Sequence, residues 1–177
     1  EQMKNHPGVS GKMFGVLGRN GINVRAIAQG SSEKNITAVI ATTDVKKAIN
    51  VLHEEFFETS YKQVNVYIAG AGNVGGKLID QINKQVAYLK KSLRLQINIV
   101  GITNSKRQLI NIEGLDLTNW KEQLAAAPTG TTAEYVAAIT NNNLRNSIFV
   151  DVTAHETVAN VYAQLLEKAV SVVACNK

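Results

Sequence analysis

The sequence has very little cysteine, since Cys175 is the only one in 177 residues. One thiol cannot form a disulfide within the chain, which excludes the disulfide-stapled class of small secreted domains and favours a reducing, cytoplasmic location. Long apolar runs are also missing: no stretch approaches the ~18 residues that a membrane-spanning helix needs, so we expect no membrane partner. No signal peptide is recognisable, although the sequence does not begin with Met, which is consistent with a fragment of a longer protein.

Dense charge of one sign and clustered metal ligands are missing as well. The formal net charge is +5, but residues 1–63 hold 8 basic and 6 acidic side chains, and residues 64–177 hold 11 and 8. The largest basic clusters are pairs, so we expect no nucleic-acid partner. The histidines His6, His53 and His155 are scattered, and no set of His, Cys and carboxylate residues has metal-ligand spacing, so we expect no metal site.

The first third of the chain predicts the order helix, strand, strand, helix. An apolar helical face over residues 9–17 ends near Gly21, a candidate left-handed C-cap. Residues 22–28 and 36–41 have the composition of strands, and residues 42–57 form a second helical pattern that opens with a Thr/Asp cap. This order makes up most of a ferredoxin-like βαββαβ unit, without its first and last strands.

From residue 63 onward, strand and helix patterns alternate. The sequence predicts strands at 64–68, 95–103, 147–153 and 170–175, a short extra strand at 108–114, and helices after residue 72 and at 117–127, 132–143 and 155–169. Alternation of this kind predicts the α/β class, with a Rossmann-type doubly wound parallel sheet. We therefore expect two domains, a partial α+β module at 1–62 and a Rossmann domain at 63–177.

Three glycines follow the first of these later strands with the spacing G-x-G-x-x-G: Gly70, Gly72 and Gly75. In a phosphate site, the first permits a tight turn, the second leaves no side chain in the way of a pyrophosphate, and the third lets the helix pack close to the strand. The N–H groups and dipole at the helix start then favour an anion. The motif alone is a weak indication, and a turn needed only for packing is the alternative. The strand–turn–helix context favours dinucleotide binding.

The segment after the second strand of this domain is Asn104-Ser105-Lys106-Arg107. NAD sites usually place an acid here, which accepts a hydrogen bond from the ribose 2′-hydroxyl. Two cations with amide and hydroxyl groups suit a 2′-phosphate instead. The segment therefore favours NADP(H) as the cofactor, with NAD(H) as an alternative. A basic solvated loop without a ligand is the other interpretation.

Several segments together resemble the bifunctional aspartokinase/homoserine dehydrogenases. They are IAQGSSEKNITAVI (27–40), VYIAGAGNVGGKLIDQI (66–82), GITNSK (101–106), GLDLTNWKEQL (114–124), VDVTA (150–154) and VVACNK (172–177). The order of the two segments, regulatory first and Rossmann second, resembles that of the fused enzyme. The monofunctional dehydrogenases carry their amino-acid-binding (ACT) module at the other end. The resemblance implies that residues 1–62 are the second ACT module and residues 63–177 the NAD(P)-binding domain.

The resemblance also implies an activity and site residues. The activity would be the NADP-dependent interconversion of aspartate semialdehyde and homoserine. Asn73 and Val74 would meet the pyrophosphate, and Thr153 and Ala154 would lie near the nicotinamide. Lys177 matches a lysine at the junction of cofactor and substrate and is a candidate catalytic residue. Ala154 stands where the family often has serine, which puts one polar contact to the nicotinamide in doubt.

For the ACT segment, the resemblance implies an amino-acid effector, with threonine expected. Gln29 matches an effector-contacting glutamine, and Asn23 sits at the matching strand start. An isolated ACT module leaves a sheet edge open, so we expect a homo-oligomer. The resemblance places the kinase domain before Glu1 and the substrate domain beyond Lys177. We therefore expect this chain to bind cofactor without appreciable dehydrogenase activity, because a hydride acceptor must be oriented against the nicotinamide.

Two other functions fit parts of the sequence. The first is a non-enzymatic sensor that pairs an ACT-like module with a nucleotide-binding Rossmann domain. The second is a methyltransferase, which also uses a glycine loop. Methyltransferases usually place an acid after the second strand, and Asn104-Ser105 argues against that class.

Overall fold

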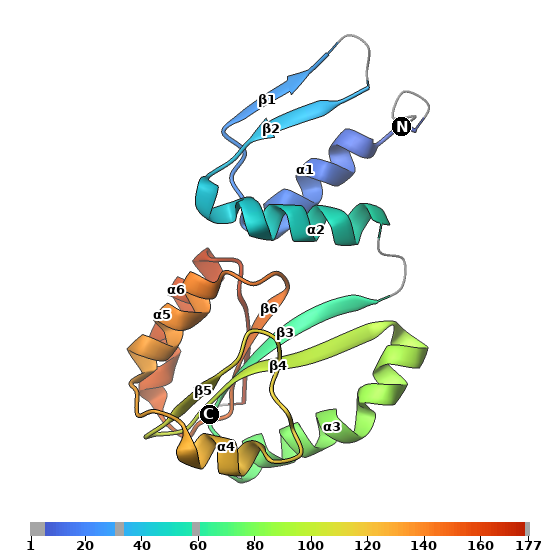
Figure 1. Cartoon of the computed structure of the whole chain (residues 1–177). Coiled ribbons are helices and arrows are strands. Elements are labelled where there is room, and N and C mark those ends of the chain that lie inside the picture. Colours follow the sequence, from blue (N-terminus) through green and yellow to red (C-terminus); the bar gives the residue numbers. More distant parts are fainter. Residues whose placement is uncertain (1–5, 31–33, 58–60, 176–177) are drawn as a thin grey trace. The chain divides into compact units, whose positions relative to one another are not determined.

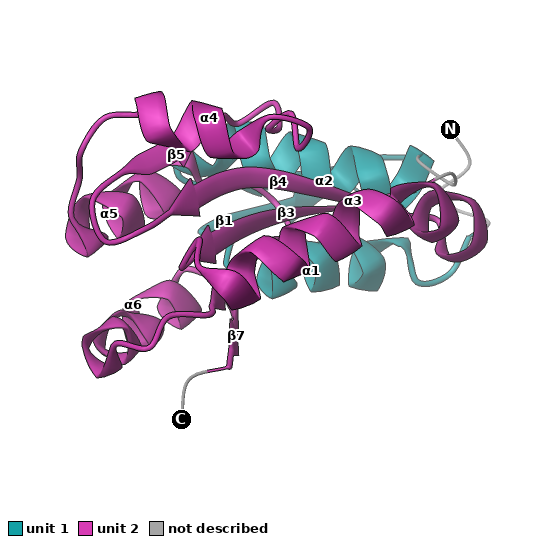
Figure 2. Cartoon of the chain, turned by 90° about the horizontal axis from the view of Figure 1, so that it is seen from below, with its two compact units in different colours: residues 1–59 teal, residues 60–177 magenta. Residues whose placement is uncertain are grey.

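The computed structural model describes residues 6–30, 34–57 and 61–175. The chain forms two compact units, residues 1–59 and residues 60–177 (Figure 2). Each unit has its own buried apolar residues.

The first unit combines two helices with a two-stranded sheet (Figure 1). Its elements are α1 (Val9–Arg19), β1 (Ala26–Gln29), β2 (Ile36–Val39), the 3-10 turn η2 (Thr42–Asp44) and α2 (Val45–Phe57). The two strands run antiparallel, with Ala26 opposite Val39. Val16 and Leu17 of α1 and Val51 of α2 are buried in one core. The arrangement confirms the partial ferredoxin-like module that the sequence predicts.

The end of α1 explains why β1 begins later than the predicted strand 22–28. Gly21 has a φ of 69°, which confirms the left-handed cap. The N–H of Ile22 donates to the carbonyl of Leu17 at 3.0 Å. This cap bond closes the helix, and the Ile22 side chain is buried against it rather than in the sheet. Pairing with β2 therefore starts only where the chain has left the cap.

The second unit is a five-stranded sheet with the order β5-β4-β3-β6-β7. Its elements are β3 (Lys62–Ala69), α3 (Asn73–Leu93), β4 (Leu95–Thr103), β5 (Gln108–Ile110), α4 (Trp120–Ala126), α5 (Thr132–Asn142), β6 (Ser147–Asp151), the 3-10 helix η3 (Glu156–Val161), α6 (Tyr162–Glu167) and β7 (Ser171–Ala174). β4, β3, β6 and β7 are parallel, and β5 runs antiparallel at the edge. The Rossmann-type sheet is confirmed.

Helices cover both faces of this sheet (Figure 1). Side chains alternate between the faces along β3, as the period of two in a strand requires. On one face, α3 and α4 pack over Val66, Ile68, Ile99, Ile102 and Val150 through Ile79, Trp120 and Leu124. On the other, α5, η3 and α6 pack over Tyr67, Ala69, Val100 and Phe149 through Tyr135, Val136, Ile139, Val158 and Leu165. The central strands are buried on both sides, which is typical of parallel sheets.

Three predicted helices differ from the structure. In the predicted helix 42–57, residues Thr42–Asp44 form the 3-10 turn η2, and α2 starts at Val45. The N–H of Thr118 donates to Asp116 Oδ1 at 2.9 Å, and this side-chain turn holds the segment out of α4, which starts at Trp120 instead of 117. The predicted helix 155–169 is the 3-10 helix η3 followed by the short α6. β-branched Thr157, Val158 and Val161 lose side-chain freedom in a regular helix, and 3-10 geometry is frequent at helix starts.

The apolar face of α3 generates a stability prediction. Ile79 is 0% exposed in the core between α3 and the sheet. We expect Ile79→Ala to lower the free energy of unfolding by about 2–5 kcal/mol, because it removes buried methyl groups and leaves a cavity. Val86→Ala is the matched control on the same helix, since Val86 is 38% exposed, and we expect a loss below about 1 kcal/mol. Denaturant unfolding measures both, and equal losses would contradict the packing described here.

Candidate functional site

The carboxyl ends of β3 and β6 lie side by side at the point where the strand order of the sheet reverses. From β3 the chain crosses to β4 on one side, and β6 lies on the other side. Ala69, the last residue of β3, pairs with Asp151, the last residue of β6. The N–H of Val152 then donates to the carbonyl of Ala69 at 2.9 Å. Open α/β sheets form a binding crevice at such a switch point, because the two connections leave it in opposite directions.

The glycine turn after β3 fills the space at this crevice with backbone alone. Gly70 has a φ of 104°, and a Cβ there would lie 2.9 Å from the carbonyl carbon and oxygen of Val152. A Cβ at Gly75 would lie 1.9 Å from the carbonyl oxygen of Gly70. Side chains are excluded at both positions, since real Cβ atoms do not approach backbone so closely. Close backbone packing is therefore sufficient to explain why the first and third residues of the motif are glycine.

Gly72, the middle glycine, has a different environment. It is the N-cap of α3, and no heavy atom lies within 4 Å of a Cβ built on it. Packing against the described residues therefore does not require glycine here. The first turn of α3 contains no acidic residue, and the cap makes no side-chain hydrogen bond. The backbone N–H groups that begin this 21-residue helix face the same space, which suits an anion.

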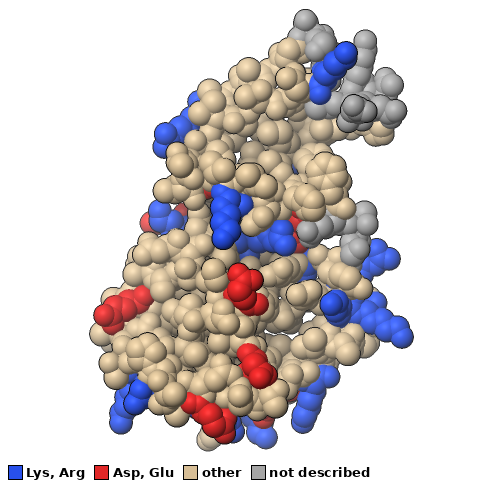
Figure 3. Space-filling model, viewed as in Figure 1, with Lys and Arg blue, Asp and Glu red and all other residues tan. Residues whose placement is uncertain are grey.

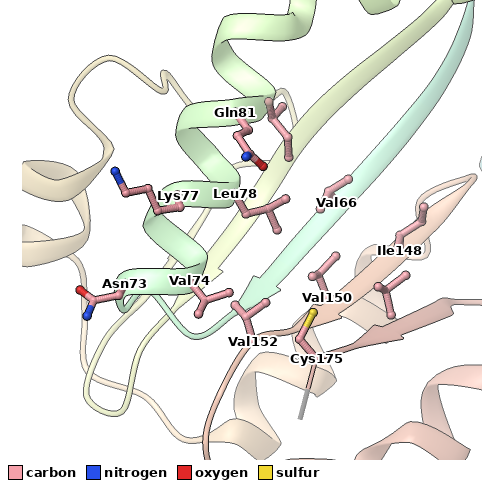
Figure 4. A pocket seen from close by; sticks show the side chains of 12 residues that line it. Val66, Asn73, Val74, Lys77, Leu78, Gln81, Ile148, Val150, Val152 and Cys175 are labelled. Carbon is pink, nitrogen blue, oxygen red and sulfur yellow. The ribbon is translucent and has the colours of Figure 1, made fainter.

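A cavity of about 610 Å³ lies beside the start of α3 (Figure 4). The side chains of Val74, Val152 and Cys175 converge on it, whereas the Lys77 ammonium group points away. The other lining residues are Val66, Asn73, Leu78, Gln81, Ile82, Ile148, Val150 and Val173. Because this lining is almost entirely apolar, a phosphate would lie at the N–H groups of the helix start rather than inside the cavity.

The basic loop after β4 is held by its own hydrogen bonds. Asn104 Oδ1 accepts from the N–H groups of Lys106 and Arg107, both at 2.8 Å. The Arg107 guanidinium is half-buried and donates to the carbonyl of Ala127. Arg107 therefore ties the loop to the segment after α4, and Ser105 and Lys106 are the exposed residues at its tip. The sequence predicted two cations for a 2′-phosphate, and this geometry leaves Lys106 as the exposed one in the loop.

This loop and the glycine turn lie at neighbouring strand ends. Ala69 of β3 pairs with Thr103 of β4, and the N–H of Gly70 donates to the Thr103 carbonyl at 2.9 Å. On the other side, a Cβ at Gly70 would lie 3.1 Å from the N of Thr153. Asn104 and Thr153 therefore flank the glycine turn. The structure brings together the cofactor-site residues that the sequence analysis named, and these are Gly70, Gly72, Asn73, Val74, Gly75, Asn104, Ser105, Lys106, Thr153 and Ala154.

The remaining predicted site residues lie elsewhere. Asn23 and Gln29 are exposed residues of the first unit, three residues before β1 and at its last position. Lys177 falls outside the residues that the structure describes.

Two residues that the sequence analysis did not name as site residues meet beside the site, Asp151 at the end of β6 and Tyr162 at the start of α6. Asp151 is 0% exposed, and its Oδ2 accepts from the Tyr162 hydroxyl at 2.5 Å. Burial, together with the hydrogen bond to Asp151 and its charge, raises the pKa of Tyr162 to about 12. The signal in the sequence is an acid that ends the apolar run SIFVD, since an unpaired carboxylate in a buried strand is costly.

The charged surface and the possible metal ligands of the described residues are the other features relevant to a site. Lys and Arg are interspersed with Asp and Glu on the face shown in Figure 3. Among residues 6–30, 34–57 and 61–175, no three His, Cys, Asp or Glu side chains come together in a way that could hold a metal ion. Within the same described part of the chain, no helix has the length and apolar character needed to span a membrane.

Known bifunctional enzymes resemble this chain along nearly its whole length. Bifunctional aspartokinase/homoserine dehydrogenase 2, chloroplastic, from Zea mays is 38% identical over 178 residues, which are 99% of this chain and 19% of the relative. The bifunctional aspartokinase/homoserine dehydrogenase of Haemophilus influenzae is 36% identical over 176 residues, 99% of this chain and 21% of the relative. The chain therefore spans about a fifth of the length of these relatives.

A solved structure and two domain-family models also match parts of the chain. The crystal structure of a protein of unknown function from Candida auris matches with a TM-score of 0.50 and 28% identity, covering 65% of this chain and 31% of that one. A sequence model of the ACT domain family matches residues 1–56. A second model, homoserine dehydrogenase, NAD binding domain, matches residues 70–177, more than half of the chain. The chain therefore belongs to the homoserine dehydrogenase NAD-binding domain family, and an ACT domain precedes that domain.

Proposed function

We propose that this chain is the cofactor-binding and regulatory portion of a bifunctional aspartokinase/homoserine dehydrogenase, which interconverts aspartate semialdehyde and homoserine. The observation that carries the proposal is the glycine turn. Two of its glycines are required by backbone packing, while the middle one faces open space at a helix start. A turn needed only for packing would not require glycine at that middle position, Gly72. A site for a pyrophosphate requires it.

The phosphates and the two ends of the cofactor have separate supports in this proposal. The N–H groups of Asn73 and Val74 at the start of α3 bind the pyrophosphate. The loop of Asn104, Ser105 and Lys106 holds the adenosine end, and the segment of Thr153 and Ala154 lies against the nicotinamide. Bound NADP(H) supplies or accepts the hydride. The residues of this chain bind the cofactor and orient its nicotinamide.

NADP(H) is the proposed cofactor because of Lys106. The loop is shaped by the side chain of Asn104, and Arg107 is held by the carbonyl of Ala127, so Lys106 is the cation at the loop tip. A 2′-phosphate would gain a charge-assisted hydrogen bond from its ammonium group. The described loop contains no acid that could accept from the 2′-hydroxyl of NAD.

The first unit supplies regulation in this proposal. Its ACT domain binds an amino-acid effector, proposed to be threonine, through Gln29 and Asn23. Ile27 is 57% exposed and Val39 52% exposed on the two-stranded sheet, which supports assembly into a homo-oligomer. Lys177 is the proposed catalytic residue at the junction with the substrate. The single cysteine supports a reducing location, proposed to be the cytoplasm, although the Zea mays relative is named chloroplastic.

Calorimetric titration of NADPH and NADH tests the cofactor assignment. We expect NADPH to bind more tightly than NADH, and Lys106→Ala to weaken NADPH binding by about 10-fold, because one charge-assisted hydrogen bond is lost. NADH binding should change by less than about 2-fold. Lys84→Ala is the control, since Lys84 is an exposed lysine of α3 outside the site. Equal losses for both cofactors would contradict the 2′-phosphate contact.

The middle glycine tests the pyrophosphate site. We expect Gly72→Ala to change the free energy of unfolding by less than about 1 kcal/mol, because the space around it is open. The added methyl group should weaken NADPH binding by at least about 10-fold through steric exclusion of the pyrophosphate.

Gly75→Ala provides the contrast, because its Cβ would collide with the Gly70 carbonyl oxygen. We expect that variant to lose stability, measured by thermal unfolding, whether or not cofactor is present. Unchanged NADPH binding in Gly72→Ala would mean that the glycine turn serves packing alone.

A further inference from the structure

Asp151 is a buried carboxylate on β6, a strand that lies between β3 and β7 in the sheet. It ends β6, is 0% exposed, and pairs with Ala69 on one side and with Ala174 on the other. A carboxylate taken out of water is costly unless donors surround its oxygens. Hydrogen bonds from neighbouring groups must therefore offset the cost of burying this carboxylate.

The donors to Asp151 come from three different segments. Its Oδ1 accepts from the N–H of Thr153 at 2.8 Å, and its Oδ2 accepts from the Tyr162 hydroxyl at 2.5 Å. Its backbone carbonyl accepts from the N–H of Cys175 at 2.9 Å. Asp151 therefore joins the segment after β6, the first residue of α6 and the end of β7. Charge-assisted hydrogen bonds of this length are among the stronger ones in proteins.

Tyr162 is itself held in place. Its ring lies edge-on to Phe149 of β6, with centroids 6.4 Å apart and an interplanar angle of 61°. Phe149 in turn contacts Tyr135 of α5, with centroids 6.5 Å apart. Burial and Asp151 raise the pKa of Tyr162 to about 12, so the hydroxyl remains a donor even at a pH above the ordinary tyrosine pKa of 10.0. The Tyr162 hydroxyl that donates to Asp151 is thus held by the aromatic residues of the core between the sheet and α5 and α6.

The segment between these two residues is fixed from the other side as well. Val152 donates its N–H to Ala69, and its carbonyl group packs against the Cα of Gly70 in the glycine turn. Thr153 follows directly and gives its N–H to Asp151. The Thr153 backbone therefore lies between the glycine turn and the Asp151–Tyr162 hydrogen bond.

We propose that Asp151 and Tyr162 are positioning residues that hold the Thr153–Ala154 segment against the nicotinamide end of the bound cofactor. Neither residue touches the cofactor in this proposal. They act through the Thr153 backbone. The inference rests on the proposed function, because it takes the segment after β6 as the nicotinamide contact. It adds two residues, 11 positions apart and on different elements, that the glycine motif does not include.

Two probes separate positioning from general stability. NADPH engages both ends of the site, whereas adenosine 2′,5′-bisphosphate has the adenine and the 2′-phosphate but no nicotinamide. Tyr162→Phe keeps the ring and removes the hydroxyl. We expect the Kd for NADPH to rise about 3–10-fold, the value of one hydrogen bond, and the Kd for the bisphosphate to change by less than about 2-fold. The fluorescence of bound NADPH, which reports the nicotinamide environment, should shift toward that of free NADPH.

Tyr135→Phe is the matched control. It removes a hydroxyl from the same aromatic row, and that hydroxyl lies 3.4 Å from the carbonyl of Ile68 rather than at the segment after β6. We expect this variant to bind both probes within about 2-fold of the unmodified chain, and to leave the fluorescence of bound NADPH unchanged.

Each outcome decides the inference. Equal weakening of both probes by Tyr162→Phe, or no weakening of either, would overturn it. If circular dichroism shows that Tyr162→Phe does not fold, Asp151→Asn replaces it, because the amide keeps the side-chain size and removes the negative charge that strengthens both hydrogen bonds. The same selective loss of NADPH affinity is then expected. An unmodified chain that binds neither probe would overturn the proposed function itself, which is distinguishable from selective failure at the nicotinamide end.

Discussion

The arrangement of the second unit around its crevice depends on one close backbone contact, between the turn after β3 and the segment after β6. Gly70 approaches the Val152 carbonyl so closely that no side chain fits between them, and Gly75 approaches the Gly70 carbonyl in the same way. These contacts hold β3, the start of α3 and the end of β6 together around one point. The first N–H groups of α3 and the Thr153 segment consequently face the same space. A binding crevice follows from the packing of the backbone.

The sheet beneath this point is rigid because it is buried on both faces. Alternate residues of β3 pack into two separate cores, one under α3 and α4 and one under α5 and α6. Tyr67, Tyr135, Phe149 and Tyr162 form a continuous row of aromatic contacts in the second core. That row ends at Asp151, so the packing of the core extends to the edge of the cofactor site. Dense packing of this kind keeps the strand ends in one relative position.

The two units differ in how completely they bury their apolar residues. The second unit has five strands and two cores, whereas the first has two four-residue strands with exposed Ile27 and Val39. A two-stranded sheet is only marginally stable by itself. The sheet of the first unit therefore depends on further packing, either against helices or against additional strands.

Local patterns in the sequence determined the class of each unit and the place of the site. The alternation of apolar residues predicted β4 at its observed bounds and both helices of the first unit. The glycine spacing predicted the turn at the end of β3, and the segment 104–107, with two cations and no acid, was predicted to follow β4. These features depend on neighbouring residues and on the period of a helix or strand, which the sequence contains directly.

Contacts between distant residues were decided only by the tertiary structure. Arg107 is held by a carbonyl 20 positions away, Tyr162 reaches Asp151 from another element, and the antiparallel direction of β5 depends on its pairing with β4. The sequence alone presented Arg107 as a second cation and Asp151 as a residue inside the predicted strand 147–153, whereas β6 ends at Asp151. Neither partner lies within the period of a local pattern, so no spacing rule could have paired them. Residue types and spacing therefore determined which residues follow the strand ends, while long-range packing decided which of them stay exposed there and which are held by distant partners.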